Sequence, residues 1–239
     1  MKWLRRKSTI VVAISLVVVL AAAVSLWNVS GSRTFQFFGE VVDRVDTDEK
    51  VIALTFDDGP HPAGTREVLD VLAEQQVTAT FFLNGSDLAG HPDLGRAIVE
   101  AGHEVGNHTY HHRRMVGVLP GTVEREIEDT DARIRLAGYE GPVHFRPPYG
   151  KKLFALPHYL SEHDRKTITW DVEPDSEGTP PAERVVEQTL AETGPGSIIL
   201  LHPMFPARTE TRKALKPIIT GLKERGYRFV TVSELLAVR

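Results

Sequence analysis

The chain has no cysteine among its 239 residues, and this absence narrows the chemistry open to it. Disulfide bonds, thiolate metal sites and thiol nucleophiles are all excluded. Any bound metal must therefore be held by histidine and carboxylate side chains. The length suffices for one full-sized domain with a large core, and no repeat or low-complexity tract indicates a second domain.

Acidic residues are missing from the first 33 positions, where the basic residues are Lys2, Arg5, Arg6, Lys7 and Arg33. Since the formal net charge of the whole chain is -4, the remainder carries a net charge of -9. A negatively charged folded part repels phosphate backbones. We therefore expect no nucleic-acid partner.

One long apolar run, residues 10–27, contains no charged side chain. As a helix rising ~1.5 Å per residue, it would cross the hydrocarbon layer of a bilayer. Basic residues precede it, so the positive-inside rule places the N-terminus in the cytoplasm and the rest of the chain outside. The run predicts a single-pass membrane anchor or a signal peptide, since the small residues at 21–25 resemble cleavage sites. We favour the anchor; a cleaved leader would give a secreted protein.

The predicted organisation is a basic stub with its anchor or signal at residues 1–33, followed by one domain at 34–239. Residues 28–39 are expected to be a short tether or a segment lying on the domain. From residue 51 onward, short β-rich runs alternate with helical patterns, which predicts an α/β fold with a parallel sheet, open or closed into a barrel. Strands are expected at 51–56, 78–83, 103–106, 143–146, 167–172, 197–201 and 228–232. Four glycines fall just after these helical patterns, where helix C-caps are expected: Gly102, Gly138, Gly194 and Gly226.

Reactive side chains fall at or just beyond the C-terminal ends of different predicted strands. They are Asp57, Asp58, His108, Arg146, Asp171 and His202. In α/β barrels that rim is where active sites are built. The placement therefore favours a barrel and marks its rim as the site.

Two adjacent acids, Asp57 and Asp58, precede a Gly59-Pro60 turn. Consecutive strand residues face opposite sides, so a turn is needed to direct both carboxylates into one site. The alternative is an ordinary acidic turn with no chemical role.

His108 and His112 are four residues apart, so a helical turn would place both imidazoles on one face, where they could hold one metal ion. Solvent-facing histidines are the alternative, and His111 is the less favoured ligand. Arg146 precedes two prolines, at the end of a stiff segment where its guanidinium could bind a carboxylate or form only a rim salt bridge. His202 follows an uncharged run and is either a site residue or a core histidine satisfied by the backbone.

Four segments, in this order, resemble motifs of the polysaccharide deacetylases, the carbohydrate esterases with a NodB-homology domain. They are Thr55–Gly59, His108–His112, Arg146–Gly150 and Leu200–His202. The resemblance covers about residues 50 to 235 and implies a distorted (β/α) barrel with fewer than eight repeats, in agreement with about seven parallel strands. It also implies a metal-dependent hydrolase that removes N-acetyl groups from an extracytoplasmic glycan such as peptidoglycan or a chitin-like chain.

The resemblance further implies residue roles. Asp58, His108 and His112 would bind the metal, Asp57 would be the catalytic base and Arg146 would orient it. His202 would be the general acid, and the backbone N–H of Tyr149 would help to bind the oxyanion.

The fourth motif of the family departs from its usual Asp-Trp here, because no tryptophan follows Asp171. The acid that tunes His202 is therefore open. We favour Asp175, with Glu173 and Asp171 as rivals.

Nitrogen and oxygen ligands suit zinc, and cobalt, nickel or manganese would fit the same donors. Water on such an ion becomes far more acidic, with a pKa near ~7 in favourable zinc sites. Two alternative functions stay open: an esterase that removes O-acetyl groups from a polysaccharide, and a membrane-tethered glycan-binding module that has lost activity. The oligomeric state is open.

Overall fold

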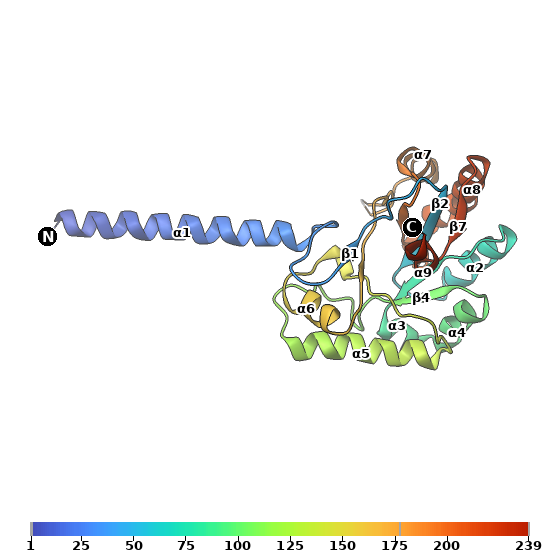
Figure 1. Ribbon diagram of the computed structural model, residues 1–239, viewed down its shortest axis with the longest axis horizontal. Helices are drawn as coiled ribbons and strands as arrows, with labels where there is room; N and C mark the ends of the chain where they lie inside the picture. Colours follow the sequence, from blue (N-terminus) through green and yellow to red (C-terminus); the bar gives the residue numbers. More distant parts are fainter. Residues whose placement is uncertain (1, 177, 239) are drawn as a thin grey trace.

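A parallel β-sheet forms the centre of the computed structural model, which describes residues 2–176 and 178–238, with side chains from residue 12 onward. Within these residues every pair of strands is parallel. The strands are β1 (Val41–Val42), β2 (Val51–Asp57), β3 (Thr80–Leu83), β4 (Glu104–Asn107), β5 (Thr167–Ile168), β6 (Ile198–Leu201) and β7 (Arg228–Val230). Helices surround the sheet, as Figure 1 shows.

Pairing between strands runs almost completely around a distorted barrel, as predicted. β4, β3, β2 and β6 are successive neighbours, β7 pairs with the start of β2, and β1 pairs with β5. Single bridges close the remaining gaps: Phe145 pairs with both Asn107 and Thr167, and Val172 pairs with Ile199. The circuit is therefore regular on one side and reduced to isolated bridges on the other.

The prediction of a strand at 143–146 was wrong, since this run pairs only at Phe145. Pro142 and Pro147 bracket it, and proline cannot donate to a strand ladder. The predicted strand at 167–172 is shortened to β5 with a bridge at Val172. β1, only two residues long, was not predicted.

Helices lie before, between and after the strands. They are α1 (Lys2–Ser30), α2 (Thr65–Glu74), α3 (Gly85–Gly90), α4 (Pro92–Glu100), α5 (Pro120–Leu136), α6 (Ala155–Glu162), α7 (Ala182–Glu192), α8 (Thr209–Glu224) and α9 (Val232–Ala237), with 3-10 turns at Pro148–Gly150 and Pro206–Arg208. The apolar patterns predicted α2, α4, α5, α7 and α8. Helices α3, α6 and α9 are too short to show a helical period.

Glycines 102, 138 and 226 follow their helices in the left-handed region, as predicted for C-caps. The prediction for Gly194 was wrong, because α7 ends in extended backbone at Thr193.

Alternate residues of β2 face opposite sides of the sheet. Ile52, Leu54 and Phe56 pack against the surrounding helices, whereas Val51 and Ala53 belong to the cluster inside the barrel. Thr55 and Asp57 continue this inner row toward the C-terminal rim. The period of the strand therefore aims Asp57 into the barrel mouth.

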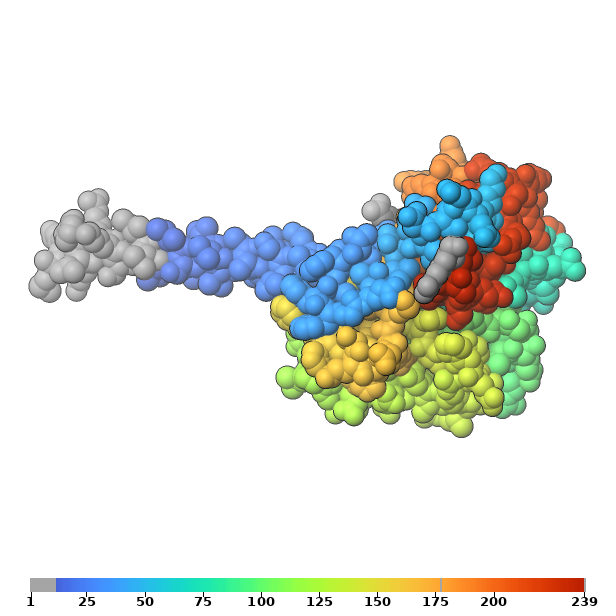
Figure 2. All heavy atoms as spheres, in the orientation of Figure 1, coloured from blue at the N-terminus to red at the C-terminus, as the bar shows by residue number. Residues whose placement is uncertain are grey.

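Helix α1 projects from one side of the domain (Figure 1), and its described side chains before Asn28 are exposed. Its part from Val12 to Ser30 is long and apolar enough to cross a membrane, a property that a signal sequence shares. The chain after it lies across the domain surface (Figure 2) and reaches β5 through β1. Of the two alternatives for residues 28–39, the segment lying on the domain is the one observed; the domain boundary at 33 and 34 stays a prediction.

Candidate active site

The end of β2 turns sharply, and this turn brings two consecutive carboxylates to one place. Asp58 has a φ of 69° and Gly59 a φ of 72°, both in the left-handed region. Aspartate tolerates this region better than most side chains do, and glycine adopts it freely. Asp57 therefore points inward from the strand while Asp58 is swung back toward the same mouth.

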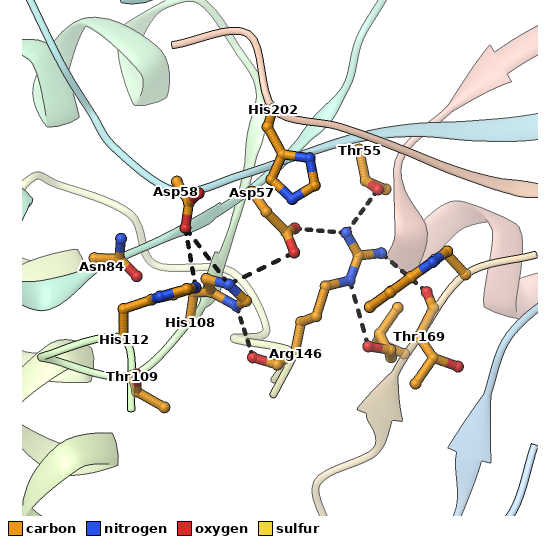
Figure 3. Close-up of polar contacts among 12 residues, drawn as sticks. Thr55, Asp57, Asp58, Asn84, His108, Thr109, His112, Arg146, Thr169 and His202 are labelled. Carbon is orange, nitrogen blue, oxygen red and sulfur yellow. Dashed lines mark hydrogen bonds and ion pairs between the residues drawn. The ribbon is translucent and has the colours of Figure 1, made fainter. Parts of the chain in front are cut away.

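Arg146 is fully buried and holds Asp57 in place. Its Nη1 donates to Asp57 Oδ1 at 2.7 Å and to Thr55 Oγ1 at 2.8 Å, and its Nη2 donates to the carbonyl oxygen of Thr169 at 3.0 Å (Figure 3). The guanidinium carbon lies 4.1 Å from the ring centroid of Phe82. A planar cation bonded on two edges and stacked on a ring has one orientation, so the carboxylate of Asp57 has one too.

His108 follows β4 and is buried at the bottom of the mouth. Its Nδ1 lies 2.8 Å from the carbonyl oxygen of Arg146, and because a carbonyl can only accept, this nitrogen carries the hydrogen. Burial, together with the charge of His112, lowers the pKa of His108 to about 3. The ring is therefore neutral, and its Nε2 presents a lone pair.

Asp58, His108 and His112 converge to form a group of three potential metal ligands. His112 Nε2 lies 3.2 Å from Asp58 Oδ1, His108 Nε2 lies 3.8 Å from the same oxygen, and one ligand atom from each residue falls within 4.8 Å of the others (Figure 3). The expected helical turn is absent: Thr109 and His112 have φ values of 68° and 53°, so a tight loop brings the rings together. The spacing of four residues predicted that the rings of His108 and His112 lie together, as they do, but a loop rather than a helical turn brings them there.

The chemistry of these donors fits a divalent cation. The unprotonated Nε2 of His108 faces Asp58 Oδ1 and lies 3.6 Å from Asp57 Oδ2. A lone pair and carboxylate oxygens repel one another unless positive charge lies among them. Neutral imidazole and carboxylate are also the forms in which these groups bind zinc and related metals.

His202 approaches from the other wall, at the end of β6, and points toward Asp57 in Figure 3. Its Nδ1 lies 3.0 Å from Asp175 Oδ1, while its backbone N–H donates to Asp175 Oδ2 at 2.8 Å. Burial alone would lower the pKa of His202, but the hydrogen bond and charge of Asp175, with the charges of Asp57 and Asp58, raise it to about 9. The imidazole is therefore protonated at neutral pH.

Asp175, the favoured residue, lies against His202. Its two rivals, Asp171 and Glu173, are bonded elsewhere. Asp171 accepts hydrogen bonds from Ser197 Oγ at 2.8 Å and the Ile198 N–H at 2.9 Å. Glu173 accepts from Trp170 Nε1 at 2.7 Å. Asp175 itself is fully buried, and although burial raises its pKa, the hydrogen bonds from His202 outweigh this effect and lower it.

A cleft of about 420 Å³ is lined by Asp57, Asp58, His108, His112 and His202. Tyr149, with a φ of 58°, is half exposed at its edge, and its backbone N–H forms no hydrogen bond with another described residue. This donor is free to meet a ligand in the cleft. These five side chains and the Tyr149 amide thus lie at one mouth, although they come from four segments that are far apart in the sequence.

Sequence reasoning missed several residues that support the site. Thr55 could have been found, because it shares a strand face with Asp57. Thr211 Oγ1 donates to Asp175 Oδ2 at 3.0 Å from helix α8, and no local pattern announces it. Arg33 lines the cleft from the segment after α1, paired with Glu173 and 4.9 Å from the Trp170 ring; it lay outside every motif.

Comparisons with known proteins point the same way as this geometry. The sequence model of the family described as "Polysaccharide deacetylase" matches residues 44–181. A peptidoglycan-N-acetylglucosamine deacetylase of Bacillus cereus is 37% identical over 200 residues, covering 83% of this chain and 93% of that protein. A chitooligosaccharide deacetylase of Sinorhizobium fredii is 38% identical over 197 residues, covering 78% of this chain and 92% of the relative.

Solved structures of the same kind superimpose closely. A peptidoglycan N-acetylglucosamine deacetylase gives a TM-score of 0.77 at 34% identity, over 81% of this chain and 91% of that one. A Bacillus anthracis protein described as a CE4 family pseudoenzyme gives a TM-score of 0.73 at 29% identity, over 82% and 68% of the two chains. Overall fold alone therefore does not separate active from inactive relatives, and the side chains of the cleft must do so.

Proposed function

Because the chain belongs to the polysaccharide deacetylase family, we propose that it hydrolyses N-acetyl groups on an extracytoplasmic glycan, peptidoglycan or a chitin-like chain, with a divalent metal ion in its cleft. The supporting observation is the convergence of three separate units in one mouth. These are the ligand group of Asp58, His108 and His112, the oriented carboxylate of Asp57, and the protonated imidazole of His202. Family relatives that carry this name act on peptidoglycan N-acetylglucosamine and on chitooligosaccharides.

Asp58, His108 and His112 would hold the metal, with zinc as the expected ion and cobalt, nickel or manganese as substitutes. A bound divalent ion supplies Lewis acidity, which acidifies water and polarises the acetyl carbonyl. The remaining steps fall to the side chains of the chain itself.

Asp57 would take a proton from the attacking water; in support, Arg146 fixes one of its oxygens and leaves the other facing the cleft. The water oxygen bonds to the acetyl carbon, and the Tyr149 N–H is available to the oxygen that becomes negative. Breaking the C–N bond then requires a proton on nitrogen, because an amide anion is a very poor leaving group. His202 carries that proton, and the products are acetate and a free amine on the sugar.

A catalytically decayed glycan-binding module is a weaker alternative. A pseudoenzyme shares the fold, but a binding module has no need of a carboxylate oriented by a buried arginine or of an imidazole charged by a buried aspartate. Both features are intact here.

An esterase that removes O-acetyl groups is the second alternative of the same chemistry. An alcohol leaves more readily than an amine, so an ester depends less on His202 as an acid. Replacing His202→Gln should therefore reduce release from an N-acetylated glycan far more than release from an O-acetylated one. An equal loss on both substrates would count against this assignment of the acid.

The deciding experiment is acetate release from a panel of acetylated glycans by the full chain in detergent. Activity should disappear after dialysis against a chelator and return with zinc, while elemental analysis should find about one ion per chain that the Asp58→Ala variant lacks. Undiminished acetate release from metal-free protein would overturn the mechanism. No release from any glycan by metal-loaded protein would favour the binding module.

We further propose that α1 anchors the protein in the cytoplasmic membrane with the domain outside, or directs its secretion if it is cleaved. The support is the length and composition of α1 and the basic residues before it. Mass spectrometry of the membrane-bound protein tests which of the two occurs.

A further inference from the structure

We propose that the catalytic domain docks onto the outer surface of the membrane that α1 spans, through the aromatic patch formed by Phe35, Phe37, Phe38 and Phe154. The inference rests on the membrane-anchored form of the proposed function. The docked partner is the lipid headgroup region of the bilayer.

The aromatic patch is exposed to an extent unusual for phenylalanine. Exposed fractions are 49% for Phe35, 41% for Phe37, 42% for Phe38 and 47% for Phe154. Three of the rings adjoin one another: Phe35 and Phe37 have centroids 5.4 Å apart, and Phe37 and Phe154 have centroids 4.7 Å apart. Phe38 follows Phe37 in the chain, and its ring lies 5.2 Å from that of His158 in α6. Single exposed apolar residues are ordinary, but a contiguous cluster marks a surface that meets another apolar phase.

The end of α1 is attached firmly to the domain rather than joined by a loose linker. Lys151 Nζ donates to the carbonyl oxygen of Trp27 at 3.0 Å and lies 4.3 Å from the centre of its ring. The Lys152 N–H donates to the carbonyl oxygen of Ser30 at 2.8 Å, and its Nζ donates to that of Ser32 at 2.5 Å. Ser30 is fully buried. The orientation of the helix relative to the domain is therefore set by these bonds.

The aromatic patch lies beside that attachment. Phe35 follows Ser30 by five residues, so the chain cannot carry it more than about 18 Å from the helix end. In Figure 1 the loop after α1 and helix α6, which begins next to Phe154, lie on the side of the domain from which α1 projects. Figure 2 shows the same loop spread over that side. A helix that crosses a bilayer would press this side against the headgroups.

The identity of the partner follows from this continuity. Aromatic side chains are favoured at the boundary between headgroups and hydrocarbon, and the half-exposed Trp27 at the end of α1 is already placed there. Gly31 and Arg33, from the same loop, line the catalytic cleft. Docking would thus hold the cleft at the membrane surface and select glycan strands that lie close to it.

The absence of cysteine allows a direct test with single spin labels on the full chain in phosphatidylethanolamine and phosphatidylglycerol nanodiscs. Labels are attached to Phe37→Cys and Phe154→Cys. The matched control is Leu136→Cys, an exposed apolar residue at the far end of α5, and Val18→Cys reports on α1 itself. Collision with oxygen, which concentrates in lipid, and with a water-soluble nickel chelate measures the depth of each label.

Docking predicts that labels at 37 and 154 collide with oxygen several-fold more, relative to nickel, than the label at 136 does. Replacing the other three patch residues by serine should return a label at Phe38→Cys to the aqueous value, while acetate release from a soluble chitooligosaccharide stays unchanged. A label at 37 as open to nickel as the label at 136 would overturn the proposal. A lipid-buried label at 18 in that same outcome would leave the anchor intact and refute docking alone; an aqueous label at 18 would refute both.

Spin–spin broadening between labels at 37 would instead identify a second copy as the partner and also overturn docking. Acetate release, measured on the same samples, reports on the deacetylase function independently of either result.

Discussion

Two charge pairs face each other across the cleft, and they use one physical device for opposite purposes. In the Arg146–Asp57 pair the side chains are 0% and 3% exposed; in the His202–Asp175 pair they are 16% and 0% exposed. In both, a buried group fixes the orientation of its partner. Arginine stays protonated at every accessible pH, so the first pair only orients, whereas histidine titrates, so the second pair sets a pKa.

Burial decides which side chain of each pair can react in the cleft. On one side the cation is sealed and the carboxylate meets the cleft. On the other side the carboxylate is sealed and the imidazole meets the cleft. Each pair thus leaves its reactive member at the surface of the mouth.

Replacing Asp57, the side chain of the Arg146–Asp57 pair that faces the cleft, should have the largest effect on activity. Asp57→Asn keeps an oxygen for Arg146 but cannot accept a proton, so kcat for acetate release should fall by about 10² to 10⁴. Steady-state kinetics on a chitooligosaccharide measures the loss. Asp171→Asn, next to the bridge at Val172 and bonded away from the cleft, is the control and should keep most of the activity. Comparable losses in the two variants would remove the special role of Asp57.

Removing the orienting member should cost stability as well as activity. Arg146→Met leaves Asp57 buried without its cation, and breaking a buried pair in this way costs about 3–5 kcal/mol in the free energy of unfolding. Urea denaturation checks the value. Arg66→Met breaks an ion pair whose side chains are 66% and 68% exposed, and should cost less than about 1 kcal/mol. Similar losses at both positions would mean that burial does not distinguish the pairs.

Replacing Asp175, the buried side chain of the His202–Asp175 pair, should shift the pH profile of kcat rather than abolish activity. His202 has its pKa raised to about 9, so it is protonated below that value and activity should decline as the pH rises through it. In Asp175→Asn the largest of the interactions that raise the pKa of His202 is lost while burial still lowers it, so the alkaline limb of kcat should move down from about 9 toward the ordinary histidine value of ~6.5. Wild type and variant are compared over pH 5 to 10.

The same shift has a consequence for stability. Because the folded pKa is the higher one, the stabilisation from His202 is complete below its ordinary value and is lost as the pH rises toward 9. Glu173→Gln, on the same loop but without contact to His202, should leave the alkaline limb in place. An unmoved limb in Asp175→Asn would show that His202 is not the titrating acid.

A third pair extends the comparison toward the solvent and should give the smallest effect. The Arg33 and Glu173 side chains are 42% and 14% exposed at the edge of the cleft. Arg33→Ala should raise KM a few-fold with little change in kcat, since a cation at the edge of the cleft is placed to bind the glycan away from the reacting bond. Arg33→Lys should recover part of the loss. A fall in kcat with unchanged KM would place Arg33 among the groups that act in the transition state.

Sequence reasoning succeeded where local pattern and chemistry agree. The strand ending at Asp57 is apolar on both faces, and its alternation sends Asp57 inward. The long amphipathic helices α2, α4, α5, α7 and α8 are stabilised by apolar stripes that the sequence displays. The predicted strand ends correctly indicated that Asp57, Asp58, His108, Arg146 and His202 lie together. They also indicated Asp171, and this was wrong, because Asp171 is bonded to Ser197 and Ile198 away from the cleft.

It failed where a single tertiary contact decides. Phe145 pairs with two partners at one residue, which no run of residues announces. The loop from His108 to His112 depends on two left-handed residues that are not glycine, so the spacing of four suggested a helix that does not form. The preference for Asp175 as the partner of His202 agrees with the structure. Arg33 was missed because it lies in a loop whose docking depends on Lys151 and Lys152.

The left-handed turn at Asp58 also decides how the cleft would respond to thermal motion. Asp58, the proposed metal ligand, and Asp57, the proposed base, are adjacent, so a single rigid peptide unit sets the spacing of their backbones. His112 lies on the loop beyond β4, whereas His202 directly follows β6 and is bonded to the buried Asp175. We therefore expect gentle warming to separate His112 from Asp58 before it alters the spacing of the two carboxylates, so that an ion held between His112 and Asp58 would be lost before the fold melts.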